Sequence, residues 1–144
     1  MEYVNKGIAE EVTINLGSRN NVQERQIPVI KLPDKQISQY VEEYSGEKID
    51  WGGALTIFQK ETGKPQIIIS KNLPEKLQEV LLEHERAQLE VILNWTANGR
   101  PKHQILQLAH DIGVQAGTEK AKELGIIKLY KDFREKPHLN KNKF

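Results

Sequence analysis

Residues 66–95 read QIIISKNLPEKLQEVLLEHERAQLEVILNW, and they carry the clearest signals of secondary structure in the chain. It opens with a short run of β-branched residues, which is typical of a buried strand, and continues into a segment with helical periodicity. At the junction Asn72 or Leu73 can cap a helix, and Pro74 fits the first helical turn. We therefore predict a strand that is followed, after a short loop, by a long helix.

The predicted helix carries one apolar stripe, and two polar residues fall inside it. His84 and Gln88 stand at steps of three or four from their apolar neighbours. The apolar members of the stripe are Leu77, Val80, Leu81, Val91, Ile92 and Trp95. We expect both polar side chains to face the core side of the helix.

The residues before this helix predict a small sheet. Residues 54–70, ALTIFQKETGKPQIIIS, read as two strands joined by a turn at 62–65, because β-branched residues flank a break with Gly and Pro. Three earlier segments read as strands or brief helices, with turn signals near 17–21 and 33–34; they are residues 10–17, 26–32 and 37–46.

A second long helix follows the first. Asn98 and Gly99 end the first helix, Pro101 can start the next, and Gly125 can stop it. On this second helix Gly113, Gly117 and Ala121 form a row of small residues, where another backbone can approach closely. The pattern as a whole predicts an α+β fold: a small N-terminal sheet with two long packed C-terminal helices.

The length of 144 residues fits one domain, which we place at residues 1–133. Residues 131–144, KDFREKPHLNKNKF, are polar and lysine-rich and are interrupted by a proline, so we expect this end to fray. The domain boundary then leaves a polar, basic tail at residues 134–144.

Composition narrows the classes of partner and site. The 21 basic and 20 acidic residues nearly cancel, so no global field draws the protein to nucleic acid or membrane. Cysteine is absent, which leaves His, Asp, Glu and amide oxygens as metal ligands. No apolar run approaches the ~20 residues of a membrane span, and the first residues lack the order of a signal peptide. We expect a cytoplasmic protein without a membrane partner.

The stretch EHERAQ contains the first half of a zinc-peptidase motif. Zinc peptidases of the His-Glu-x-x-His type place two imidazoles four positions apart on one helical face, with the Glu as general base. His84 and Glu85 fit the first two positions, and Gln88 stands where the second His should be. With the preceding strand and loop, residues 54–111 resemble the core of the minimal zincin metallopeptidases.

The resemblance implies a zinc site and a role for each matching residue. His84 would be the first zinc ligand, Glu85 the general base, and Gln88 would occupy the position of the second ligand. The third ligand would come from the later helix, where His103, His110 and Asp111 are candidates, and we take His110 as the first choice.

The glutamine is the main departure from the family pattern. An amide oxygen at position 88 has the reach of a ligand, but zinc prefers nitrogen donors, so zinc affinity should fall. The inverted order His-x-x-Glu-His does not rescue the match, because position 80 is Val80.

Each site residue also has a purely structural interpretation. A histidine in an apolar stripe is often a hydrogen-bonded core residue, and Gln88 can bond a backbone carbonyl. Glu83, Glu85 and Glu90 can form a solvated face paired with Arg86. For His103 and His110 the structural role is favoured, because the row of small residues on their helix already implies packing.

The leading hypothesis for function is a metallopeptidase-like hydrolase domain with an altered zinc site, acting on a peptide or protein. The alternative is a non-catalytic interaction module on the same scaffold, binding protein or nucleic acid. Residues 128–143 hold six basic and two acidic side chains that could touch phosphate. The near-neutral net charge argues against nucleic acid, and the sequence predicts no oligomeric state.

Overall fold

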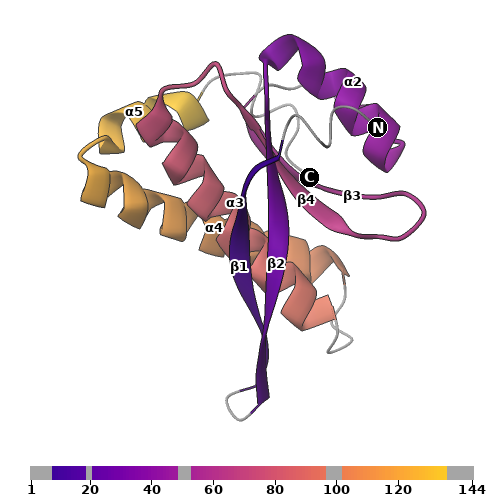
Figure 1. Cartoon of the computed structure of the whole chain (residues 1–144). Helices are drawn as coiled ribbons and strands as arrows, with labels where there is room; N and C mark the ends of the chain where they lie inside the picture. The colour runs from indigo at the N-terminus through magenta and orange to yellow at the C-terminus, as the bar shows by residue number, and fades with distance from the viewer. Residues whose placement is uncertain (1–7, 19–20, 49–52, 97–101, 136–144) are drawn as a thin grey trace.

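The computed structural model describes residues 8–18, 21–48, 53–96 and 102–135 (Figure 1). These residues form four strands and four helices. In chain order they are β1 (Ile8–Ser18), β2 (Asn21–Leu32), α2 (Asp34–Ser45), β3 (Ala54–Phe58), β4 (Pro65–Ser70), α3 (Glu75–Thr96), α4 (Lys102–Leu124) and α5 (Ile127–Arg134). The α+β prediction is confirmed: a mixed sheet comes first and two long helices pack behind it.

The sheet has the strand order β1-β2-β4-β3. β1 pairs antiparallel with β2, and β3 pairs antiparallel with β4, which confirms the hairpin predicted for residues 54–70. β2 and β4 join the two hairpins by parallel pairing at the centre of the sheet. The hairpin turn includes Gly63 with φ at 72°, a left-handed conformation that suits glycine.

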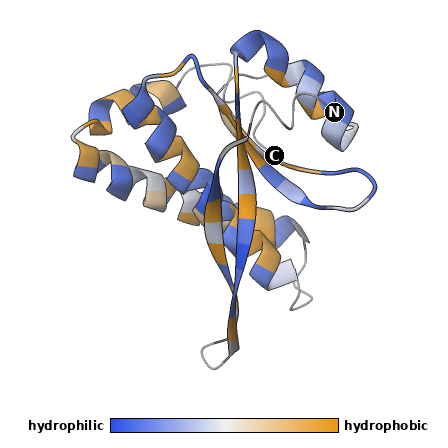
Figure 2. Cartoon of the chain, in the orientation of Figure 1, coloured by the Kyte–Doolittle hydropathy of each residue, from blue (hydrophilic) through white to orange (hydrophobic). Residues whose placement is uncertain are grey.

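The sheet is covered on both faces, so the molecule has three layers (Figure 1). α2 covers one face and buries Ile37, Tyr40, Val41 and Tyr44, which share a helical stripe. The helix therefore resolves the ambiguity between strand and brief helix at residues 37–46. α3 covers the opposite face, and its apolar stripe meets the orange, hydrophobic strand residues seen in Figure 2.

The start of α3 differs in one detail from the prediction. Gln78, in its first turn, donates from its backbone N–H to the Pro74 carbonyl and from its side chain to the Leu73 carbonyl. The Asn72 side chain does not cap this helix: its Oδ1 accepts from the N–H of Asp34, the first residue of α2, at 2.8 Å. This amide thus links the beginnings of two helices on opposite faces of the sheet.

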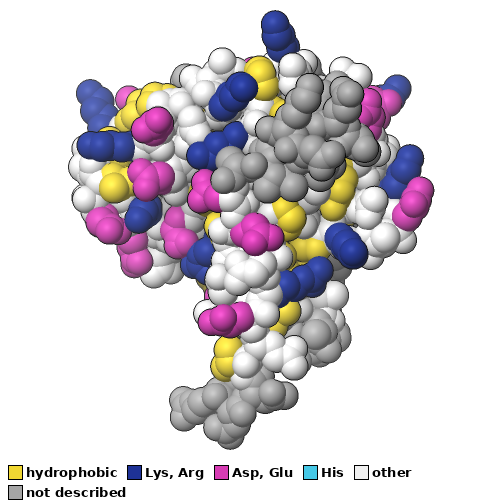
Figure 3. All heavy atoms as spheres, in the orientation of Figure 1, with side chains coloured by type: hydrophobic (Ala, Val, Ile, Leu, Met, Phe, Trp, Pro, Cys, Tyr) yellow, Lys and Arg dark blue, Asp and Glu magenta, His cyan; other side chains and the backbone are white. Residues whose placement is uncertain are grey.

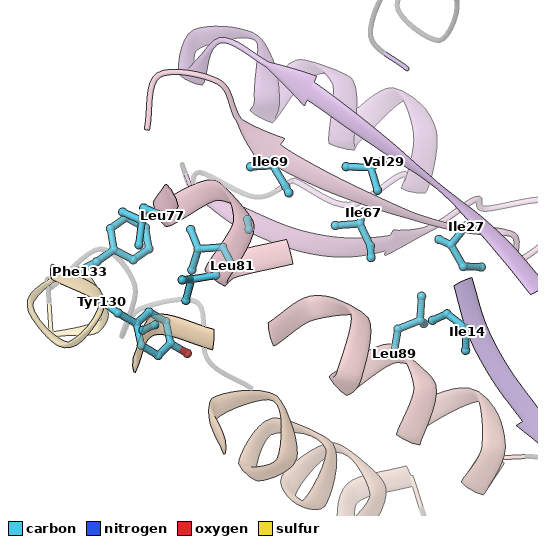
Figure 4. Close-up of a cluster of buried hydrophobic side chains, with 13 residues drawn as sticks. Ile14, Ile27, Val29, Ile67, Ile69, Leu77, Leu81, Leu89, Tyr130 and Phe133 are labelled. Atoms are coloured by element: carbon cyan, nitrogen blue, oxygen red, sulfur yellow. The ribbon is translucent and has the colours of Figure 1, made fainter. Parts of the chain in front are cut away.

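The second long helix ends as predicted, and the segment beyond it is ordered further than the sequence suggested. Gly125 follows α4 with φ at 74°, as expected for a helix stop. The expectation that residues 131–134 fray is wrong, because they belong to α5, which buries Tyr130 and Phe133. Both rings point toward Leu77 and Leu81 of α3 (Figure 4). Residues 136–144 of the predicted tail lie outside the described residues.

Candidate functional site

His84 lies on the side of α3 that meets α4, and a glycine makes this position possible. The side chain is buried, as predicted from the stripe. A Cβ on Gly113 of α4 would lie 2.9 Å from His84 Cδ2 and 3.0 Å from the His84 carbonyl oxygen. The first member of the small-residue row therefore lets the α4 backbone approach the imidazole directly.

Both ring nitrogens of His84 have hydrogen-bond partners. Nε2 lies 3.1 Å from Oε1 of Gln88, and Nδ1 lies 3.0 Å from the hydroxyl of Tyr130. An amide oxygen only accepts, so Nε2 donates its proton to Gln88. With the imidazole neutral, Nδ1 carries no proton and accepts from the tyrosine hydroxyl. We call His84, Gln88 and Tyr130 the His84 network.

Tyr130 reaches the network from α5 through a gap in α4. A Cβ on Gly117 would lie 2.8 Å from Cζ of Tyr130, so the second small residue of the row makes room for the phenol. Burial raises the pKa of Tyr130 to about 12. The hydroxyl therefore keeps its proton at neutral pH and remains the donor to His84.

Glu85 is buried beside His84 and bonds to the sheet. One carboxylate oxygen accepts from the Thr56 hydroxyl at 2.9 Å, and the backbone N–H of Thr56 also bonds to the carboxylate. Burial raises the pKa of Glu85 to about 7, against the opposing effect of the Thr56 bonds. Its other oxygen lies 3.9 Å from Nε2 of His84. Glu85 therefore does not belong to a solvated acidic face, because it points inward. The other two glutamates, Glu83 and Glu90, pair with Arg86 as expected.

The structure separates the three candidates for a third ligand. His110 is half-buried, and the centroid of its ring lies 5.8 Å from that of His84, with the ring planes at 61°. His103 and Asp111 are exposed, and Asp111 accepts from Gln107 at 3.4 Å. His84, Gln88 and His110 therefore come together, and the other two candidates do not join them.

The donors brought together are two imidazoles and one amide. Catalytic zinc sites use three protein ligands and keep a fourth position for water. Among the residues that the structure describes, no three His, Cys, Asp or Glu side chains are grouped closely enough to hold a metal. A metal at Nε2 would have to displace the hydrogen bond to Gln88.

Two residues of the site were not identified from the sequence. Tyr130 stands in a segment with apolar side chains at Ile126, Tyr130 and Phe133, and this spacing of four and three is a helical signal that could have located it. Thr56 had no such signal. Its bond to Glu85 joins positions 29 residues apart and depends on the strand order.

Comparison with known proteins identifies no relative: no family model, no curated protein and no solved structure matches this chain. Within the described ranges, no helix combines the length and apolar character that a membrane crossing requires.

Proposed function

We propose that the protein is a non-catalytic, protein-binding domain on a zincin-like scaffold, in which the His84 network stands in place of a zinc site. One observation carries this proposal: both ring nitrogens of His84 are used in hydrogen bonds to Gln88 and Tyr130. A histidine that serves as a zinc ligand keeps one ring nitrogen for the metal and uses only the other for a hydrogen bond.

The state of Glu85 supports the same conclusion. A general base in a hydrolase must reach a water molecule next to the substrate. Glu85 is 8% exposed, and its carboxylate holds the hydroxyl and backbone N–H of Thr56 on the edge strand β3. In this arrangement the carboxylate fastens α3 to the sheet, which is a structural task.

The choice of protein over nucleic acid as partner rests on charge. Lys and Arg side chains are mixed with Asp and Glu over the face seen in Figure 3, rather than gathered into one basic surface. Binding to phosphate backbones depends on several clustered cations. The expectation of a cytoplasmic location stays a prediction.

Zinc binding of the wild type and of Gln88→His tests the proposal. We expect the wild type, purified without chelator or metal affinity, to contain no stoichiometric zinc and to gain no thermal stability when zinc is added. Gln88→His supplies a second imidazole four residues from His84, with His110 nearby, so it should bind zinc in calorimetry. It serves as the positive control for the assay.

The opposite result would overturn the proposal. If the wild type carries one zinc per chain, and His84→Ala loses that zinc while remaining folded, then His84 is a metal ligand and the hydrolase hypothesis takes its place. Gln88→Glu provides a second check. A carboxylate is a better metal ligand than an amide, and it has nearly the same volume, so the surrounding packing is unchanged.

A further inference from the structure

The free edge of β1 is closed along half of its length by side chains of α3. The N–H of Asn15 donates to Glu90 Oε2 at 2.9 Å, and the N–H of Gly17 donates to Asn94 Oδ1 at 2.8 Å. The Asn94 amide also donates to the Asn15 carbonyl at 2.9 Å. At residues 15–17, α3 thus supplies the donors and acceptors that a neighbouring strand would supply.

The other half of this edge has no such closure. In an antiparallel pair, the residues whose backbone groups point away from the partner strand recur at every second position. Since Asn15 and Gly17 point outward, Glu11 and Thr13 do so as well. Among the residues that the structure describes, none bonds to the backbone N–H or carbonyl groups of Glu11 and Thr13 on this side.

A groove adjoins this part of β1, where Glu10 and Val12 line it. It has a volume of about 310 Å³ and is bounded by β1, β2, the first half of α3 and Lys120 of α4. Val12 and Leu82 supply its apolar surface. Because side chains alternate along a strand, Val12 faces the groove from between the two open positions, Glu11 and Thr13.

The charged side chains around the groove favour a ligand with a positive charge. Its three cations already have acidic partners: Lys31 pairs with Glu10 at 3.4 Å, Arg86 pairs with Glu83, and Lys120 pairs with Glu123 at 3.7 Å. Glu79 also lines the groove, and no cation in the described part of the chain pairs with it. A basic group is therefore the complementary one.

We propose that an extended peptide of a partner protein adds to β1 as a fifth strand, pairing with Glu11 and Thr13. Its groove-facing side chains are apolar against Val12 and Leu82 and basic opposite Glu79. Strand addition satisfies the open backbone groups, and the alternate side chains give specificity. This inference rests on the proposed function as a protein-binding domain, and it names the surface and the class of partner.

Edge β3 is not an equivalent site. Its outward-pointing residue Thr56 already donates its backbone N–H and its hydroxyl to Glu85. A peptide at that edge would have to displace a buried carboxylate, whereas β1 offers open groups beside a groove.

A peptide titration followed by amide NMR tests this site. The probe is the blocked peptide acetyl-Thr-Val-Thr-Lys-Thr-Val-Thr-amide, which carries Val, Lys and Val on one face as a strand. We expect the largest chemical-shift changes at Glu11, Val12 and Thr13, with a dissociation constant of about 1 mM or below.

Thr13→Pro removes one outward N–H, which an edge strand tolerates, and should weaken binding about tenfold. Thr13→Val is the matched control, because it loses the same hydroxyl contact with Gln26 but keeps the N–H.

Charge reversal gives a second, independent readout. Glu79→Lys should weaken binding of this peptide about threefold and strengthen binding of the same peptide with Glu in place of Lys. The proposal is overturned if the peptide does not bind at about 1 mM, if Thr13→Pro and Thr13→Val bind alike, or if the shifts lie at β3. It is also overturned if dilution of the free protein moves the Glu11 and Thr13 signals, since a second copy then covers the edge. None of these results depends on zinc, so they are separable from the test of the zinc site.

Discussion

The hydroxyl of Tyr130 donates to Nδ1 of His84 at 3.0 Å, although the two residues are 46 positions apart. The bond passes between α5 and α3 at the point where Gly117 of α4 has no side chain. Three helices therefore meet at one buried polar contact. The His84 network fixes the last helix of the described chain to the helix that covers the sheet.

Removal of the Tyr130 hydroxyl should destabilise the fold. Tyr130→Phe keeps the ring but leaves Nδ1 of His84 as a buried acceptor without this donor, which costs about 1–3 kcal/mol. Urea unfolding followed by circular dichroism measures the change. Tyr44→Phe is the matched control, because its hydroxyl donates to the Lys64 carbonyl in a less buried position, and it should lose about 1 kcal/mol or less. Equal losses in both variants would contradict the special role of Tyr130.

Filling the gap in α4 should also be destabilising. Gly117→Ala places a methyl group 2.8 Å from Cζ of Tyr130, and the resulting overpacking should cost about 1–3 kcal/mol. This loss opposes the gain of about 1 kcal/mol that alanine usually brings to a helix interior. Gln115→Ala, on the exposed side of the same helix, should be nearly neutral. Thermal unfolding of the two variants distinguishes the packing effect from helix propensity, and a stabilised Gly117→Ala would contradict it.

Glu85 should make stability depend on pH. Its pKa is about 7 in the folded protein, where burial raises it, and 4.5 as the ordinary value. Between these values the folded state binds more protons than the unfolded chain, so the free energy of unfolding falls as pH rises. Below 4.5 both states are protonated and above about 7 both are ionised, so this contribution is flat outside the window. The fall across the window is of the order of 3 kcal/mol.

Glu85→Gln isolates this contribution. The amide has no proton to lose, and its Oε1 can still accept from Thr56. As pH rises from 4.5 to about 7, the wild type should therefore lose stability relative to the variant. The control is Glu79→Gln, which makes the same substitution at an exposed position on the same helix. If the difference for Glu85→Gln does not change with pH, the Glu85 carboxylate is solvated and this prediction is wrong.

Asn94 should protect the edge of β1 from solvent. Asn94→Ala removes the acceptor of the Gly17 N–H and the donor to the Asn15 carbonyl. We expect amide hydrogen exchange at Gly17 to accelerate about tenfold or more, while core amides such as that of Ile67 in β4 keep their rates. Uniform acceleration would instead indicate global destabilisation.

The sequence predicted those elements whose signals are local. The long helix 75–96, the hairpin 54–70 and the stop at Gly125 follow from periodicity and turn residues, and the structure confirms them. The burial of His84 and Gln88 likewise follows from their place in an apolar stripe.

Contacts between distant elements were not accessible in this way. The roles of Glu85 and Asn72 depend on what lies opposite them, which are Thr56 in β3 and Asp34 in α2. Neither partner is fixed by spacing along the chain. The last helix differs from the expectation for another reason: the charges of residues 131–134 are typical of a solvated tail, whereas the packing of Tyr130 and Phe133 against α3 decides the structure.

The parallel pairing of β2 with β4 has a consequence for how the chain folds. Each of the two hairpins can form from contacts between near neighbours, which is fast. Val29 and Ile67, at the centre of the sheet, pair only after the intervening α2 and β3 have been folded back as a closed loop. The entropy of closing that loop must be overcome before the central contacts stabilise it. We therefore expect the union of the two hairpins to be the step that sets the folding rate.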